Sequence, residues 1–332
     1  MKYATVCSGI EAPSLAWHPL GWQPVFFSEI EKFPSAVLNH YYPNTPNLGD
    51  MTKIQAENYY GSVDVFCGGT PCQSFSIAGL RKGLADPRGN LMLSFVGIAA
   101  KMRPRWIIWE NVPGVLSSNA GRDFGTLLGA LGELGYGFAY RVLDAQFFGV
   151  AQRRRRVFVI GYLGDWRPAA AVLFEPESLR GHTSESRKKR KAITFYAESS
   201  IGGYRETNVG GTLKKSGGCL GGGSETFTVC AFKVRSGCEG GGKGYLGQDE
   251  LTFTLSTNQD QMIFEKNIFV RRLTPIECER LQGFPDNFTN IPWRGKSESS
   301  DSLRYAALGN SMAVPVMAWL GKRIDYIQNL ML

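Results

Sequence analysis

This chain of 332 residues lacks the features of several common protein classes. No apolar run is long enough for a membrane span, which needs about 18 residues, and the amino terminus is not a signal peptide. The seven cysteines are odd in number and include no CxxC pair, which argues against a disulfide framework and a zinc site. We therefore expect a soluble protein of the cytoplasm with reduced thiols, no metal and no membrane partner.

Acidic residues are scarce relative to basic ones, with 29 Asp and Glu against 37 Lys and Arg and a net charge of +8. The basic excess is concentrated at residues 153–156 and 187–191. In a soluble chain without an amphipathic anchor, this balance favours a polyanionic partner, nucleic acid before membrane. The alternative is a basic surface that is simply solvated.

The first half of the chain alternates between short β-branched runs and amphipathic segments. This alternation is typical of an α/β fold, a parallel sheet wound with helices on both faces. The expected strands are 3–7, 24–28, 63–67, 106–110, 141–145 and 156–162, and the expected helices are 14–20, 31–40, 91–101 and 123–134.

The composition changes after about residue 165. Residues 202–247 contain 15 glycines, interleaved with strand-like segments such as 226–229 and 251–255. We favour a loop-rich folded domain over a flexible linker, because a pure linker lacks such aromatic and β-branched clusters. Thr274, Pro275 and Glu277 predict the start of a helix, and further helices are expected at 302–308 and 314–330, the last packing back onto the first domain.

The most informative stretch is residues 68–76, Gly-Gly-Thr-Pro-Cys-Gln-Ser-Phe-Ser. It follows an apolar strand, so Cys72 lies on a loop at the carboxyl end of that strand, where open α/β sheets bind ligands. A thiol placed there can attack a substrate once its pKa is lowered or a base assists it. Cys67, expected to be buried within the strand, cannot.

A second strand end presents the carboxylate of Glu110. His18, His40 and His182 lie in unrelated segments, so a cysteine and histidine pair for peptide hydrolysis is not supported. A thiolate and a carboxylic acid instead suit addition to an electron-poor heterocycle, in which sulfur attacks carbon and the acid protonates a ring nitrogen.

Three further strand ends suggest a nucleoside site. Gly9 follows the first strand alone, where a dinucleotide fingerprint needs three glycines, so a ligand without a pyrophosphate fits better. Glu29 is placed to accept hydrogen bonds from ribose hydroxyls, and Asp50 from an adenine amino group. The alternative for each acid is a solvated turn or a helix cap.

Five motifs in order resemble those of the DNA (cytosine-5)-methyltransferase family of prokaryotic or phage type. They are Pro71-Cys72-Gln73, Glu110-Asn111-Val112, residues 152–156, residues 272–275 with 279–285, and residues 309–312. The resemblance implies S-adenosyl-L-methionine as methyl donor, S-adenosyl-L-homocysteine as product, and double-stranded DNA with a flipped-out cytosine as substrate.

By that resemblance, Cys72 adds to C6 of cytosine while Glu110 protonates or hydrogen-bonds N3, C5 takes the methyl group, and loss of the C5 proton expels the cysteine. Arg154 and Arg156 correspond to arginines that hold the flipped base. A phosphate-contacting face is the alternative for this run, and both roles are compatible because successive strand residues point to opposite faces.

The resemblance also assigns contact residues. Those expected to bind the donor are Cys7, Gly9, Ile10, Glu29, Ile30, Asp50, Met51, Leu91, Asn310 and Met312. Those expected to contact DNA are Gln73, Ser76, Gln152, Arg153 and two Thr-Leu pairs, Thr212-Leu213 and Thr254-Leu255, between which the sequence does not choose. The chain departs from the family at Cys7, where phenylalanine is usual and Ile30 could cover adenine instead, and at Glu11 and Ala12, where glycines are usual.

The family pattern divides the chain into a catalytic domain (1–165 with 303–332), a target recognition domain (166–270) and a hinge (271–302). We expect a monomer in a bacterial cytoplasm or nucleoid or in a phage-infected host, linked only functionally to any restriction endonuclease. Two alternatives stay open. A tRNA cytosine-5 methyltransferase is disfavoured because its usual Cys-Phe-Thr signature is missing, and a catalytically weak DNA-binding protein is disfavoured by the intact Cys72 and Glu110.

Overall fold

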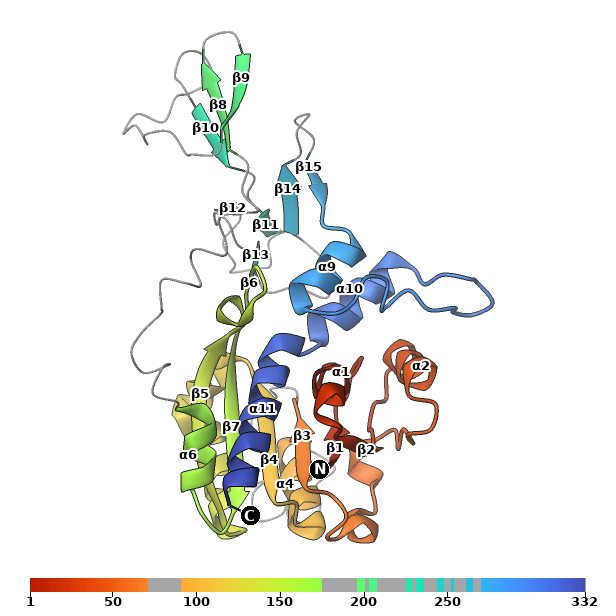
Figure 1. The fold of residues 1–332 in the computed structure, drawn as a ribbon, viewed down its shortest axis with the longest axis vertical. Coiled ribbons are helices and arrows are strands. Elements are labelled where there is room, and N and C mark those ends of the chain that lie inside the picture. Colours follow the sequence, from red (N-terminus) through yellow and green to blue (C-terminus); the bar gives the residue numbers. More distant parts are fainter. Residues whose placement is uncertain are drawn as a thin grey trace.

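The computed structural model describes residues 1–70, 91–174 and 273–331, together with the backbone of eight strands between residues 196 and 272 (Figure 1). Its main element is a six-stranded sheet in the order β2-β1-β3-β4-β7-β5. The strands are β1 (Lys2–Val6), β2 (Gln23–Phe26), β3 (Val65–Gly68), β4 (Trp106–Asn111), β5 (Tyr136–Asp144) and β7 (Arg155–Leu163).

One strand runs against the others. β2, β1, β3 and β4 pair in parallel, whereas β7 is antiparallel to both β4 and β5. The prediction of a parallel sheet is therefore wrong for β7. β7 runs antiparallel to β5 because the link between them is short. This link holds only the 3₁₀ turn η7 (Ala145–Phe148) and β6 (Gln152–Arg153), which is too little chain for a crossover helix. The amino end of β7 consequently lies at the same edge as the carboxyl ends of β1, β3 and β4.

Helices cover both faces of the sheet, as the alternating pattern predicts. One face packs against α1 (Ala12–Trp17), α6 (Arg167–Leu173) and α11 (Val314–Leu330), and the other against α4 (Leu91–Met102) and α5 (Arg122–Glu133). Within β4, Ile108 faces the first layer and Ile107 the second, the period-two alternation of a doubly covered strand. The sheet therefore separates two apolar cores.

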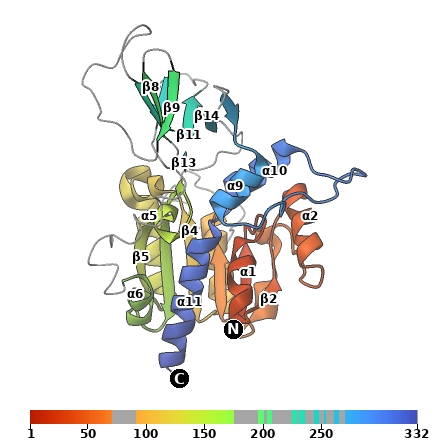
Figure 2. The same cartoon turned by 45° about the horizontal axis from the view of Figure 1, so that its top comes forward.

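The carboxyl-terminal helix packs back onto the first part of the chain, as predicted. Trp17 of α1 donates its indole N–H to the carbonyl of Met317 at 2.8 Å, and Trp106 of β4 donates to the amide oxygen of Gln328 at 3.0 Å. Figures 1 and 2 show α11 lying along the sheet beside α1. α11 thus closes the core on this face.

α6 begins beyond residue 165, where the catalytic domain was predicted to end. Its Val172 and Leu173 are fully buried in the core that α11 also covers, and Arg141 of β5 donates to the carbonyl of Leu173 at 2.8 Å. Packing on this sheet therefore continues at least to Leu173. The division into three domains stays a prediction.

Two helices follow the glycine-rich region. α9 (Pro275–Gln282) begins with the capping box of Thr274 and Glu277, and α10 (Asp301–Asn310) leads into α11. The buried carboxylate of Glu279 accepts the backbone N–H of Thr289 at 2.8 Å and pairs with Arg304 at 3.1 Å. This pairing holds α9, α10 and the segment between them together.

α2 (Lys32–Tyr41) buries Phe33, Val37 and Leu38 in the core that α1 and α11 also cover, and apart from the strands between residues 196 and 272 the other remaining elements are 3₁₀ turns. α2 follows β2, and the 3₁₀ turns are η1 (His18–Leu20), η2 (Met51–Lys53), η3 (Ala56–Tyr59), η5 (Pro113–Leu116) and η6 (Ser118–Gly121). In the part of the chain that the structure describes, no helix combines the length and apolar character needed to cross a membrane.

The strands between residues 196 and 272 form two small sheets. β8 (Tyr196–Ser200), β9 (Gly203–Thr207) and β10 (Glu225–Thr228) make one, and β11 (Ala231–Arg235), β12 (Gly244–Gly247), β14 (Gln261–Phe264) and β15 (Val270–Arg272) make the other. β13 (Thr252–Phe253) pairs in parallel with β6. β10 confirms the strand predicted at 226–229 to within one residue, and β13 covers two residues of the one predicted at 251–255. The loop-rich folded domain stays a prediction.

Candidate active site

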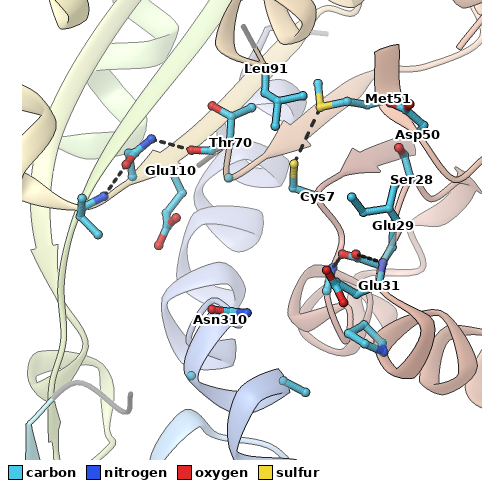
Figure 3. A pocket seen from close by; sticks show the side chains of 18 of the residues that line it. Cys7, Ser28, Glu29, Glu31, Asp50, Met51, Thr70, Leu91, Glu110 and Asn310 are labelled. Atoms are coloured by element: carbon cyan, nitrogen blue, oxygen red, sulfur yellow. Dashed lines mark hydrogen bonds between the residues drawn. The ribbon is translucent and has the colours of Figure 1, made fainter. Parts of the chain in front are cut away.

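A cavity of about 440 Å³ opens at the edge where β1, β3 and β4 end and β7 begins. Pockets for small ligands usually measure about 300 to 1,000 Å³. Figure 3 shows Glu110 on one side of this cavity and Cys7, Met51 and Asp50 on the other. Asn310 of α10 lies below them in the picture. The cavity is therefore assembled from strand ends that are far apart in sequence.

Most residues predicted to bind the donor line this one cavity: Cys7, Gly9, Glu29, Ile30, Asp50, Met51, Leu91 and Asn310. Two predicted residues lie elsewhere. Ile10 is completely buried in the core, and Met312 lines a smaller adjoining cavity. Sequence analysis missed Ser28 and Glu31, which flank the predicted acid after β2 and also line the cavity.

Glu29 ties two strand ends together. Its Oε2 accepts the backbone N–H of Gly9 at 2.8 Å, and its Oε1 accepts that of Glu31 at 2.8 Å. Each carboxylate oxygen still has a free lone pair, so the group can also accept hydrogen bonds from a ligand hydroxyl.

Asp50 serves as a helix cap and as a cavity wall. Its Oδ1 accepts the backbone N–H of Thr52 at 3.0 Å and the Thr52 hydroxyl at 2.7 Å at the start of η2. These hydrogen bonds hold the pKa of Asp50 below its ordinary value, so the group is ionised at neutral pH. The cap and the predicted ligand role are therefore compatible.

Cys7 contributes an apolar wall. It follows β1 with a left-handed φ of 51°, and its Sγ lies 3.8 Å from Sδ of Met51. Burial, reinforced by Glu29, raises the pKa of the Cys7 thiol to about 12. The thiol is therefore neutral and packs as a small apolar group.

The opposite side of the cavity carries a carboxylate and two arginines. Arg156 Nε lies 3.2 Å from Glu110 Oε1, and these two side chains are only 14% and 11% exposed. Arg154 donates to the carbonyl of Ser311 at 2.7 Å and to that of Gly309 at 3.3 Å. Desolvation lowers the pKa of Arg154 to about 9 and that of Arg156 to a smaller extent.

The predicted alternation of this arginine run is confirmed. Arg154 is buried and Arg156 half-buried toward the cavity, whereas Arg153 and Arg155 are exposed. The run therefore presents one pair of cations to the site and the other to solvent.

The chain leaves β3 along the wall of the cavity. Asn111 donates its side-chain amide to the carbonyl of Thr70 at 2.8 Å, and Trp109 donates its indole N–H to the Thr70 hydroxyl at 3.0 Å. Cys72 follows two positions later. It lies outside the described residues, as do Gln73 and Ser76.

The predicted DNA contacts are mostly outside the described residues as well, namely Thr212, Leu213, Thr254, Leu255 and the basic run at 187–191. Gln152 is described and fully buried, with its amide nitrogen 3.5 Å from the carbonyl of Leu281. Its side chain therefore faces the end of α9 rather than solvent, whereas Arg153 is exposed.

Comparison with known proteins identifies the family of this chain. The model for C-5 cytosine-specific DNA methylases matches residues 1–325. The chain belongs to this family. The DNA N-6-adenine-methyltransferase of Escherichia phage P1 is 35% identical over 97% of this chain, which spans 61% of that protein's length.

A further relative supports membership in the methylase family, and a solved structure shows the same fold. The Type II methyltransferase M.SsoII of Shigella sonnei is 31% identical over 96% of this chain and 78% of its own length. The Dnmt2 methyltransferase of S. pombe superimposes with a TM-score of 0.64 at 16% identity, covering 100% of this chain and 99% of that one, and shows a shared fold. The cavity of this methylase-family chain thus joins one side that carries Glu29 and Asp50 to another that carries Glu110 and Arg156.

Proposed function

We propose that this chain transfers a methyl group from S-adenosylmethionine to C5 of a cytosine in a specific sequence of double-stranded DNA. The proposal is supported above all by the Glu110–Arg156 pair, which shares one cavity with the predicted donor residues. A base at Glu110 and a donor beside Glu29 are therefore next to each other.

The donor half of the cavity fits S-adenosylmethionine. The carboxylates of Glu29 and Asp50 suit ribose hydroxyls and the adenine amino group, and Cys7, Met51 and Leu91 offer an apolar wall to the ring. When bound there, the donor supplies an electrophilic methyl group.

The other half holds the base. Glu110, fixed by Arg156, donates a proton or a hydrogen bond to N3 of the flipped cytosine as the Cys72 thiolate adds to C6. C5, made nucleophilic by this addition, would then take the methyl group as its bond to the donor sulfur breaks, leaving S-adenosylhomocysteine. Transfer of the C5 proton to water then lets the electron pair of the C5–H bond re-form the C5–C6 double bond, and Cys72 leaves as a thiolate. Arg156 stabilises the Glu110 carboxylate whenever the proton is on N3.

In this proposal the chain acts as a cytoplasmic monomer, residues 166–270 recognise the target sequence, and a restriction endonuclease, where present, is linked to it only by function. The exposed Arg153 adds a phosphate contact.

A second candidate is N6 methylation of adenine, the activity in the name of the phage P1 relative. Direct transfer to an exocyclic amino group needs neither a thiol nucleophile nor a proton donor for a ring nitrogen. The match of residues 1–325 to the cytosine-specific family therefore favours C5 of cytosine.

The test is methyl transfer with an isotopically labelled donor, offered duplex DNA or tRNA, followed by digestion to nucleosides and mass spectrometry. We expect label in 5-methylcytosine from DNA, and none with Cys72→Ala. Label in N6-methyladenine, or in tRNA alone, overturns the proposal.

A further inference from the structure

The carboxyl group of Glu11, immediately before α1, is buried without a full set of partners. Its exposed fraction is 0%, and within the described residues Oε1 has no hydrogen-bond partner. Oε2 accepts one long bond, 3.3 Å, from the Thr5 hydroxyl. A buried carboxyl oxygen without a partner costs free energy, so a ligand that donates to it gains affinity.

This carboxyl group faces a second, smaller cavity of about 40 Å³. Cys7, Gly9, Gly69, Glu110 and Asn310 line both this space and the main cavity, so the two adjoin. The small cavity has room for about one group of the size of a water molecule or an amino group.

The sulfur atom of the proposed donor carries three substituents: the nucleoside, the methyl group and the amino acid chain. The cavity and its neighbour offer one place for each. The nucleoside points to Glu29 and Asp50, and the methyl group must point to the base at Glu110. The amino acid chain is left with the third place, the small cavity beyond Gly9 and Gly69. Of the two groups at the end of that substituent, an α-ammonium group suits an unpartnered carboxyl oxygen and an α-carboxylate does not.

We propose that Glu11 accepts the α-ammonium group of S-adenosylmethionine in the small cavity and thereby selects donors that carry this group. The inference rests on the proposed function. It adds a specificity-determining residue to the donor site.

The protonation state of Glu11 in the free protein is consistent with this role. Burial raises the pKa of Glu11 to about 8, with Glu29 adding to the effect and the Thr5 hydroxyl opposing it. Within the described part of the chain, the titratable groups around it are Tyr3, Cys7, Tyr42, Cys67, Glu29 and Glu110. Burial raises the pKa values of the two tyrosines and the two thiols, so these four stay protonated at neutral pH.

Because an ammonium group favours the ionised carboxylate, ligand binding at pH 7 releases the proton of Glu11. Proton release is therefore a readout that does not depend on methyl transfer. Calorimetry in two buffers of different ionisation enthalpy measures it.

The deciding experiment is calorimetric titration of the full chain with S-adenosylhomocysteine and with its analogue lacking the α-amino group. For the wild type we expect the analogue to bind roughly 10- to 100-fold more weakly, the effect of a hydrogen bond to a charged group. Glu11→Gln should bind S-adenosylhomocysteine more weakly by about the same factor, and its affinity for the analogue should change little. Ligand binding to this variant should release no proton.

Two further variants separate a local role from loss of structure. Glu11→Gly suits the left-handed φ of 64° at this position and should behave as Glu11→Gln does. Asp123→Asn removes a buried carboxylate on α5, on the other face of the sheet, and should leave both affinities unchanged.

The inference is overturned if the wild type binds the two ligands with equal affinity. It is also overturned if Glu11→Gln loses affinity for both ligands by the same factor. Failure of the wild type to bind S-adenosylhomocysteine at all overturns the proposed function together with it.

Discussion

Arg156 and Glu110 lie on adjacent antiparallel strands, with Nε of the arginine 3.2 Å from Oε1 of the carboxylate. Both side chains are largely withdrawn from water, so the pair is weakly screened. Arg154, two residues earlier, is occupied by the carbonyls of Gly309 and Ser311. Among the residues that the structure describes, Arg156 is thus the arginine in contact with the carboxyl group that is proposed to face the base.

Glu110→Gln should lower the rate of methyl transfer by about 10²- to 10⁴-fold, because an amide cannot supply the proton that N3 needs. Donor affinity should change little, since the donor half of the cavity is intact. Single-turnover kinetics with a calorimetric control measures both quantities. An unchanged rate would exclude Glu110 as the acid.

Cys72→Ala should abolish methyl transfer and leave DNA binding intact, because the thiol acts in bond formation and not in recognition. DNA carrying 5-fluorocytosine at the target should trap the wild type as an adduct that survives denaturation. The variant should form none. Turnover by Cys72→Ala would refute covalent catalysis at this residue.

Cys7→Phe should tighten donor binding by up to about tenfold, since an aromatic ring stacks on adenine where the thiol only packs. Calorimetry with S-adenosylhomocysteine checks this. An unchanged affinity would show that Ile30 and Met51 already cover the ring.

Replacing Lys188, Lys189 and Lys191 together should weaken binding to all DNA sequences alike and flatten its dependence on salt, because phosphate contacts release counterions. Binding curves for target and non-target duplexes at several salt concentrations test this. Loss confined to the target sequence would assign base contacts to the run.

Arg304→Ala should destabilise the fold by about 3–5 kcal/mol, because it leaves Glu279 buried without its cation. Arg280, whose partner Asp286 is exposed, provides the matched control: Arg280→Ala should change the stability little. Urea denaturation compares the two. Equal effects would mean that the buried pair contributes no more than a surface one.

The regular elements were largely predictable from local pattern. α11 occupies the predicted residues 314–330, and the strand ends carrying Glu29 and Glu110 lie at one edge, as the rule for open sheets predicts. β5, however, begins at Tyr136 and not at residue 141. Its early residues include Gly137, where a Cβ would lie 2.1 Å from the backbone nitrogen of Trp166. Tertiary contact requires that glycine, and a propensity argument counts it against a strand.

Other features depend on partners that sequence spacing does not reveal. The hydrogen bond from Gly9 to Glu29 forms because β1 pairs with β2. The direction of β7 depends on the path that the chain takes after β5. The burial of Glu11 was equally hidden, because glutamate is rarely withdrawn from water.

The pairing of β6 with β13 connects two parts of the chain that are far apart in sequence. Gln152 and Arg153 are bonded in register to Thr252 and Phe253, and the same backbone reaches Arg154 and Arg156 within three residues. Through this short ladder, the glycine-rich part of the chain is hydrogen-bonded to the backbone that carries both arginines of the cavity.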